Sequence, residues 1–130
     1  MTEIWHNINC LEGEYSTNEI LYDANNLIIK LDSFKDNSTI TLLFPNVLAY
    51  RVTLEHFRWE EYRNTEKTHE ILYNIENSNY IKWIQDSGMR QLYGDNPKVK
   101  HYLVYTNAEI IDIVLNETER ILLNGKEISY

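Results

Sequence analysis

The chain has 130 residues, of which 43% are hydrophobic and 25% charged, and its formal net charge is −8. A length of this order predicts one globular domain, residues 1–130, whose core needs no disulfide or metal. The acidity argues against nucleic-acid binding, which depends on Lys and Arg to displace the counterions of phosphate backbones. It favours a basic partner surface, most of all at residues 1–20, which contain no Lys or Arg but include Glu3, Glu12, Glu14 and Glu19.

The cysteine count and the lack of long apolar runs indicate the compartment. Cys10 is the single cysteine, so no internal disulfide can form, as is usual in a reducing cytosol. No window approaches the ~20 apolar residues of a membrane span, and the N-terminal residues lack the basic flank and apolar run of a signal peptide. We therefore expect a cytoplasmic protein with no membrane partner.

Short strands separated by polar turns dominate the first half of the chain. Residues 20–22 and 27–31 flank the pair Asn25-Asn26 and predict a hairpin, because Asn tolerates the positive φ of tight turns. Further alternating runs lie at residues 40–44 and 48–54, separated by Pro45-Asn46. Residues 20–54 therefore predict a four-strand meander.

The middle of the chain contains the best helix signal. Residues 56–67 are dense in charge and fit neither period, so strand, short helix and loop remain open, whereas residues 70–75 predict a strand. Asn77 or Ser78 can cap a helix near residues 78–87, and Gly88 sits where a left-handed cap would end it. We expect a loop at residues 89–100.

Strands return in the last third of the chain, at residues 102–105 and 110–115. Asn124-Gly125, between residues 121–123 and 126–130, is the strongest short-range hairpin signal. The expected fold is an α+β domain, mainly an antiparallel curved sheet of meander and hairpins, with at least one covering helix near residues 78–87.

No pattern typical of catalysis, a cofactor or a metal is present. The histidines form no His-x-His or His-Glu-x-x-His pair, and the four glycines are too scattered for a phosphate loop. His56 and Glu60, with His69, form the best metal candidate, but charged helix faces produce such pairs freely. Glu60 and Glu61 could act as acid and base, although a solvated acidic face explains them. We therefore expect that the protein is not an enzyme and that it binds no cofactor and no metal ion.

The aromatic residues point to protein binding. Ten tyrosines and three tryptophans are many for this size, and Tyr and Trp supply rigid contact area at interfaces. The alternative explanation is that Trp59 covers the edge of the core while the nearby glutamates keep it in solution. We predict a partner-binding stretch formed by Phe57, Trp59, Glu60, Glu61, Tyr62 and Glu66.

A small basic cluster, Arg90, Lys98 and Lys100, precedes His101. It could pair with the acidic N-terminal residues or contact an anion. Three positive charges are too few for a nucleic-acid interface.

Three parts of the chain carry a resemblance: residues 44–55, the helix entry Glu76-Asn77-Ser78 with Trp83, and residues 101–114. They resemble the small Firmicutes immunity proteins that are encoded beside polymorphic toxins. The resemblance spans about two thirds of the chain and includes no catalytic signature. It implies a protein that binds and neutralises a toxin domain. Many such domains are basic nucleases, onto which an acidic inhibitor can steer electrostatically.

We therefore expect a non-enzymatic, acidic protein-binding inhibitor of the immunity-protein type. Its partner would be a basic toxin or effector domain. The alternative is a small β-rich ligand-binding or housekeeping domain, and a third interpretation is an enzyme that uses His56, His69, Glu60 and Glu61.

Overall fold

Strands and one helical run form the described part of the chain, which confirms the predicted α+β class. The computed structural model describes residues 2–8, 11, 13–58 and 71–128. Its elements, with η1 a 3-10 helix and η2 a π-helical turn, are β1 (Ile4–Asn7), β2 (Tyr15–Asp23), β3 (Asn26–Ser33), β4 (Thr39–Phe44), β5 (Ala49–Leu54), η1 (Glu55–Arg58), β6 (Leu72–Glu76), α2 (Asn79–Ile84), η2 (Gln85–Met89), α3 (Arg90–Tyr93), β7 (Val99–Tyr105), β8 (Glu109–Asn116), β9 (Leu122–Leu123) and β10 (Lys126–Glu127).

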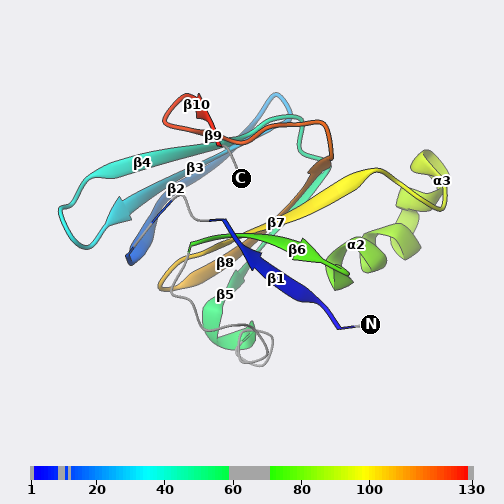
Figure 1. Ribbon diagram of the computed structural model, residues 1–130, viewed down its shortest axis with the longest axis horizontal. Helices are drawn as coiled ribbons and strands as arrows, with labels where there is room; N and C mark the ends of the chain where they lie inside the picture. Colours follow the sequence, from blue (N-terminus) through cyan, green and yellow to red (C-terminus); the bar gives the residue numbers. More distant parts are fainter. Residues whose placement is uncertain (1, 9–10, 12, 59–70, 129–130) are drawn as a thin grey trace.

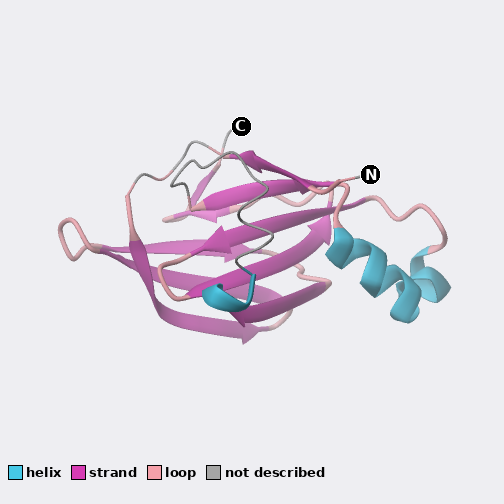
Figure 2. Ribbon diagram, turned by 90° about the horizontal axis from the view of Figure 1, so that it is seen from below, coloured by secondary structure: helices cyan, strands magenta, loops and turns pink. Residues whose placement is uncertain are grey.

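Two antiparallel five-stranded sheets pack face to face (Figure 1, Figure 2). Sheet A has the order β1-β6-β7-β8-β5, and sheet B has the order β10-β9-β4-β3-β2. The main core lies between them, because inward side chains of both sheets meet there. It includes Leu27, Ile29, Leu31, Leu42 and Phe44 from sheet B, and Leu72, Tyr102, Val104, Ile111, Ile113 and Leu115 from sheet A.

The predicted hairpins are present. β3 buries every second side chain, as its alternation predicts. Asp23 lies opposite Asn26, so the turn residues are Ala24 and Asn25, with φ of 49° and 69°, rather than Asn25-Asn26. Two successive positive φ angles are typical of the turn that matches the twist of paired strands. Asn124-Gly125 joins β9 and β10 in the same way.

The predicted four-strand meander is wrong in its last strand. β2, β3 and β4 are neighbours in sheet B, but β5 pairs with β8 in sheet A. The crossing follows Asn46, which has a φ of 48°. The backbone N–H of Val47 then donates to Asn25 at 2.7 Å, and that of Leu48 donates to Val114 at 2.9 Å. Alternation indicates a strand with an apolar face, but it does not specify which sheet supplies the neighbours.

The covering helix begins where the sequence predicts, with Ser78 as its cap, but it continues past Gly88. Gly88 has a φ of 150° inside η2, and helical chain resumes in α3 until Gly94. The expected loop at residues 89–100 is therefore wrong at its start, and also at its end, because β7 begins at Val99. Met89 packs beside Val114, so tertiary contacts hold the helical run across the glycine. None of the described helices is long and apolar enough to cross a membrane.

The outer face of sheet A is covered as well. Trp5 lies against Tyr73 with ring centroids 5.5 Å apart. Tyr80 of α2 belongs to the apolar cluster that includes Val114 of β8. Residues 110–115 of β8 are therefore all buried, on both faces of the sheet. The polar residue among them is the centre of the site described next.

Candidate functional site

A network of charged and polar side chains lies on the outer face of sheet A, with the buried Asp112 of β8 at its centre. Asp112 is 0% exposed. Its Oδ2 accepts a hydrogen bond from Nε of Arg51 at 2.8 Å and another from the guanidinium of Arg58, while its Oδ1 accepts from Nε2 of His101 at 2.7 Å. Arg51 lies directly opposite Asp112 in the β5–β8 pair. A carboxylate at this depth requires such partners, because burial of an unpaired charge is costly.

The network continues into α2 through Ser78. An ionised carboxylate only accepts, so Nε2 of His101 carries the proton, and in the neutral ring Nδ1 accepts from the Ser78 hydroxyl at 2.7 Å. The Oγ of Ser78 in turn accepts the backbone N–H of Ile81 at 2.9 Å and so caps α2. The ring of Tyr80 covers the network, 5.5 Å from His101 and 4.3 Å from the guanidinium carbon of Arg51.

Ser78, His101 and Asp112 match a hydrolytic triad in residue type, but their arrangement favours a structural role. A triad serine presents its hydroxyl to the substrate, whereas Ser78 is 5% exposed and caps a helix. Two guanidinium groups also hold Asp112, which weakens its ability to stabilise an imidazolium. The network therefore ties β5, β7, β8, η1 and α2 together.

The partners of Asp112 also set its acidity. Burial alone would raise the pKa of this carboxyl group, but the hydrogen bond from His101 and the charges of Arg58 and Arg51 lower it to about 2, from an ordinary value of 3.8. Burial raises the pKa of the nearby Tyr80 hydroxyl, because it disfavours the phenolate. Asp112 is therefore ionised at physiological pH.

Sequence reasoning missed this network, although one signal was present. Asp112 interrupts the apolar run of residues 110–115, and Asp is almost never fully buried unless it is paired. The partner Arg58 lies 54 positions away in the sequence. Local patterns therefore indicate that a partner is needed but cannot identify it.

A second feature is an apolar strip at the open edge of the sandwich, which we call the edge strip. It consists of Tyr22 on β2 and Tyr50, Val52 and Leu54 on β5, with exposed fractions of 44%, 40%, 43% and 49%. The rings of Tyr22 and Tyr50 stack with centroids 5.3 Å apart. Among the described residues, β2 and β5 are each an outermost strand, with a neighbouring strand of their own sheet on one side alone.

The predicted partner-binding residues fall partly within the described chain. Phe57 lies in η1, three positions after Leu54, and is 72% exposed. The adjacent Arg58 is buried and anchors η1 to Asp112. The other predicted residues lie outside the described residues: Trp59, Glu60, Glu61, Tyr62 and Glu66.

The three histidines in the described part of the chain do not come together. His6 pairs with Glu76 at 3.4 Å on the surface, His56 lies against Phe57, and His101 is buried. His69 and Glu60, the other members of the candidate metal site, lie outside the described residues. Within residues 2–8, 11, 13–58 and 71–128, no group of His, Cys, Asp and Glu could hold a metal ion.

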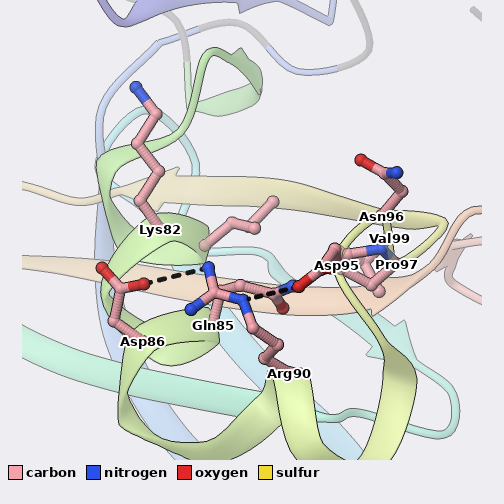
Figure 3. A pocket seen from close by; sticks show the side chains of 9 residues that line it. Lys82, Gln85, Asp86, Arg90, Asp95, Asn96, Pro97 and Val99 are labelled. Carbon is pink, nitrogen blue, oxygen red and sulfur yellow. Dashed lines mark ion pairs between the residues drawn. The ribbon is translucent and has the colours of Figure 1, made fainter.

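A hollow of about 480 Å³ lies between the helical run and the loop before β7 (Figure 3). Arg90, predicted to contact an anion or the N-terminal residues, crosses it and pairs with Asp86 at 3.1 Å and Asp95 at 3.0 Å. Ligand pockets are mostly apolar with a few polar groups. This hollow is instead lined by six polar residues, Lys82, Gln85, Asp86, Arg90, Asp95 and Asn96, beside three apolar ones, Ile81, Pro97 and Val99.

Comparison with known proteins assigns no family. No protein-family model, no curated protein and no solved structure matches the chain. Its function must be inferred from the surface, where the edge strip and Phe57 are the exposed apolar features nearest the predicted binding stretch.

Proposed function

We propose that this chain is a non-enzymatic, protein-binding inhibitor of the immunity type, which acts in the cytoplasm and neutralises a basic toxin or effector domain. The edge strip is the observation that supports this proposal, since its four large apolar side chains are 40–49% exposed. Contiguous exposed apolar surface is typical of protein interaction sites. In the sequence, Phe57 lies between Leu54 of the strip and the rest of the predicted binding stretch.

The charge around the strip suits a basic partner. β2 carries Glu19 and Asp23, and Glu55 follows β5. Arg51, the one cation within these two strands, is bound to Asp112. With a net charge of −8 for the whole chain, such a surface accelerates encounters with positively charged proteins.

The product of the gene beside the one that encodes this chain provides the test. Expressed alone in a bacterial host, it should arrest growth, and co-expression of this chain should restore growth and yield a purified complex. If growth is not restored, or if the two proteins do not bind each other, the proposed function is wrong.

Phe57→Ala tests the contribution of the stretch to the complex. Truncating a central interface aromatic costs at least ~2 kcal/mol of binding, so we expect a faster dissociation rate with an unchanged melting temperature. Leu92→Ala is the matched control, because Leu92 is 81% exposed on α3, which lies well apart from η1 (Figure 1). Equal dissociation rates for the two variants would place the binding surface elsewhere.

A further inference from the structure

β5 presents an unpaired backbone edge. It is the last strand of sheet A and, within the described chain, pairs with β8 alone. Just beyond β5, the N–H of Glu55 donates to the carbonyl of Ala108 at 2.8 Å, which identifies a hydrogen-bonded pair. Such pairs alternate along antiparallel strands, so residues 49, 51 and 53 also face β8. The backbone N–H and C=O groups that point away from the sheet are those of Tyr50, Val52 and Leu54.

We propose that this edge is the docking site for an extended, basic segment of the partner protein, which adds to sheet A as a strand beside β5. The inference rests on the proposed function and specifies how the partner is held. Main-chain hydrogen bonds to residues 50, 52 and 54 supply affinity in this mode of recognition. The same three residues carry exposed apolar side chains, so every second side chain of the added strand gains apolar contact.

The edge strand of sheet B that lies beside β5, β2, is less suited to strand addition. Its register shifts between Thr17 and Glu19, which marks a bulge or irregularity. Such features bend a strand and are a common means of preventing edge-to-edge pairing. β5 keeps an unbroken register with β8 from Ala49 to Leu54 and therefore offers three successive docking positions.

The negative charge of this chain favours a basic segment, rather than a second copy of the chain, as the strand that adds to β5. Two copies would each bring a net charge of −8 to the contact. Glu55 follows Leu54 at the end of the edge, and Glu109 lies opposite Leu54 on β8, one strand further from an added segment. A strand flanked by Lys or Arg would place opposite charges near these carboxylates, and like charges across an interface are strongly unfavourable.

A synthetic peptide tests the docking mode directly. The probe has the core Thr-Val-Thr-Val-Thr-Val with lysines at both ends, and its affinity for the full chain is measured by fluorescence anisotropy. We expect saturable binding that weakens with salt. Two N-methylated forms separate backbone pairing from simple apolar adhesion. Methylation of the amides that face β5 should weaken binding about tenfold or more, whereas methylation of the alternate amides should have little effect.

Val52→Pro tests the same edge on the protein. The N–H of Val52 points away from β8, so proline removes a donor for the added strand without breaking the β5–β8 ladder. We expect Val52→Pro to lower peptide affinity about tenfold, while the control Val52→Thr, which keeps the donor and a similar shape, binds like the native chain. Circular dichroism checks the fold of both variants. If Val52→Pro does not fold, the methylated peptides on the native chain decide.

The outcomes separate this inference from the proposed function. Docking at β5 would be overturned if the peptide shows no saturable binding, or if both methylation patterns reduce its affinity equally. It would also be overturned if the chain forms a dimer that Val52→Pro abolishes. If the neighbouring gene product is neutralised equally by the native chain and by folded Val52→Pro, the proposed function holds and docking at β5 is wrong. If the peptide binds as expected but no toxin is neutralised, the docking edge stands and the proposed function is wrong.

Discussion

Asp112 links chain segments that are distant in sequence, and its ionisation should be visible in the acid stability of the protein. Its folded pKa of about 2 lies below the ordinary 3.8, so the unfolded state binds more protons between these values. The resulting stabilisation is fully present above about pH 4 and is lost as the pH falls through about 2. Its size is about 2 kcal/mol. Urea unfolding between pH 7 and pH 2 would measure it.

Asp112→Asn should remove this pH dependence and destabilise the fold by about 3 kcal/mol at neutral pH, because it leaves buried guanidinium charge without its carboxylate. Asp36→Asn is the control, since Asp36 is an exposed turn residue whose Oδ1 accepts hydrogen bonds from Ser38. An Asp112→Asn protein as stable as Asp36→Asn would show that the network does not hold the elements together.

Ser78 has two roles that one substitution removes. Ser78→Ala deletes the cap of α2, which is worth about 1 kcal/mol, and leaves Nδ1 of the buried His101 without the hydroxyl. An unsatisfied buried group costs about 1–3 kcal/mol, so we expect a total loss of about 2 kcal/mol or more in urea unfolding. Ser38→Ala, at an exposed turn, is the comparison. A loss limited to that of Ser38→Ala would contradict both roles.

At the scale of the element, the β2–β3 turn carries a residue that does not suit it. Ala24 has a φ of 49°, a conformation that costs a residue with Cβ roughly 1–2 kcal/mol. Ala24→Gly removes this strain at some cost in backbone entropy, so we expect a net gain of about 0.5–1 kcal/mol, seen as a higher melting temperature. Gly125→Ala, at a φ of 84° in the β9–β10 turn, should show the opposite sign. A lower melting temperature for Ala24→Gly would refute the turn assignment.

The elements differ in how far the sequence predicts them. The alternation of residues 27–31 and the pair Asn124-Gly125 predict strands and turns correctly, because period and turn chemistry are local properties. Other features depend on contacts between distant residues, which local patterns do not contain. These features are the sheet to which β5 belongs, the helical chain beyond Gly88 and the pairing of Arg58 with Asp112. Of the predicted binding residues, Phe57 is exposed, and the residues of the edge strip were predicted only as parts of strands.

At the scale of the whole molecule, the charge of −8 should decide which polymers it binds. Several of its cations are already paired with carboxylates of the same chain, among them Arg51, Arg58, Arg90 and Arg120. The 12 Lys and Arg side chains also stand against 20 Asp and Glu, and this negative balance opposes contact with a phosphate backbone, so we expect no gel shift of duplex DNA or RNA at physiological salt. A charge-reversed variant, with Glu14, Glu19 and Glu117 replaced by Lys, serves as a positive comparison and should gain weak, salt-sensitive binding. A shift by the native chain that weakens with salt would show that a local basic surface outweighs the net charge and that the partner of this protein is a nucleic acid.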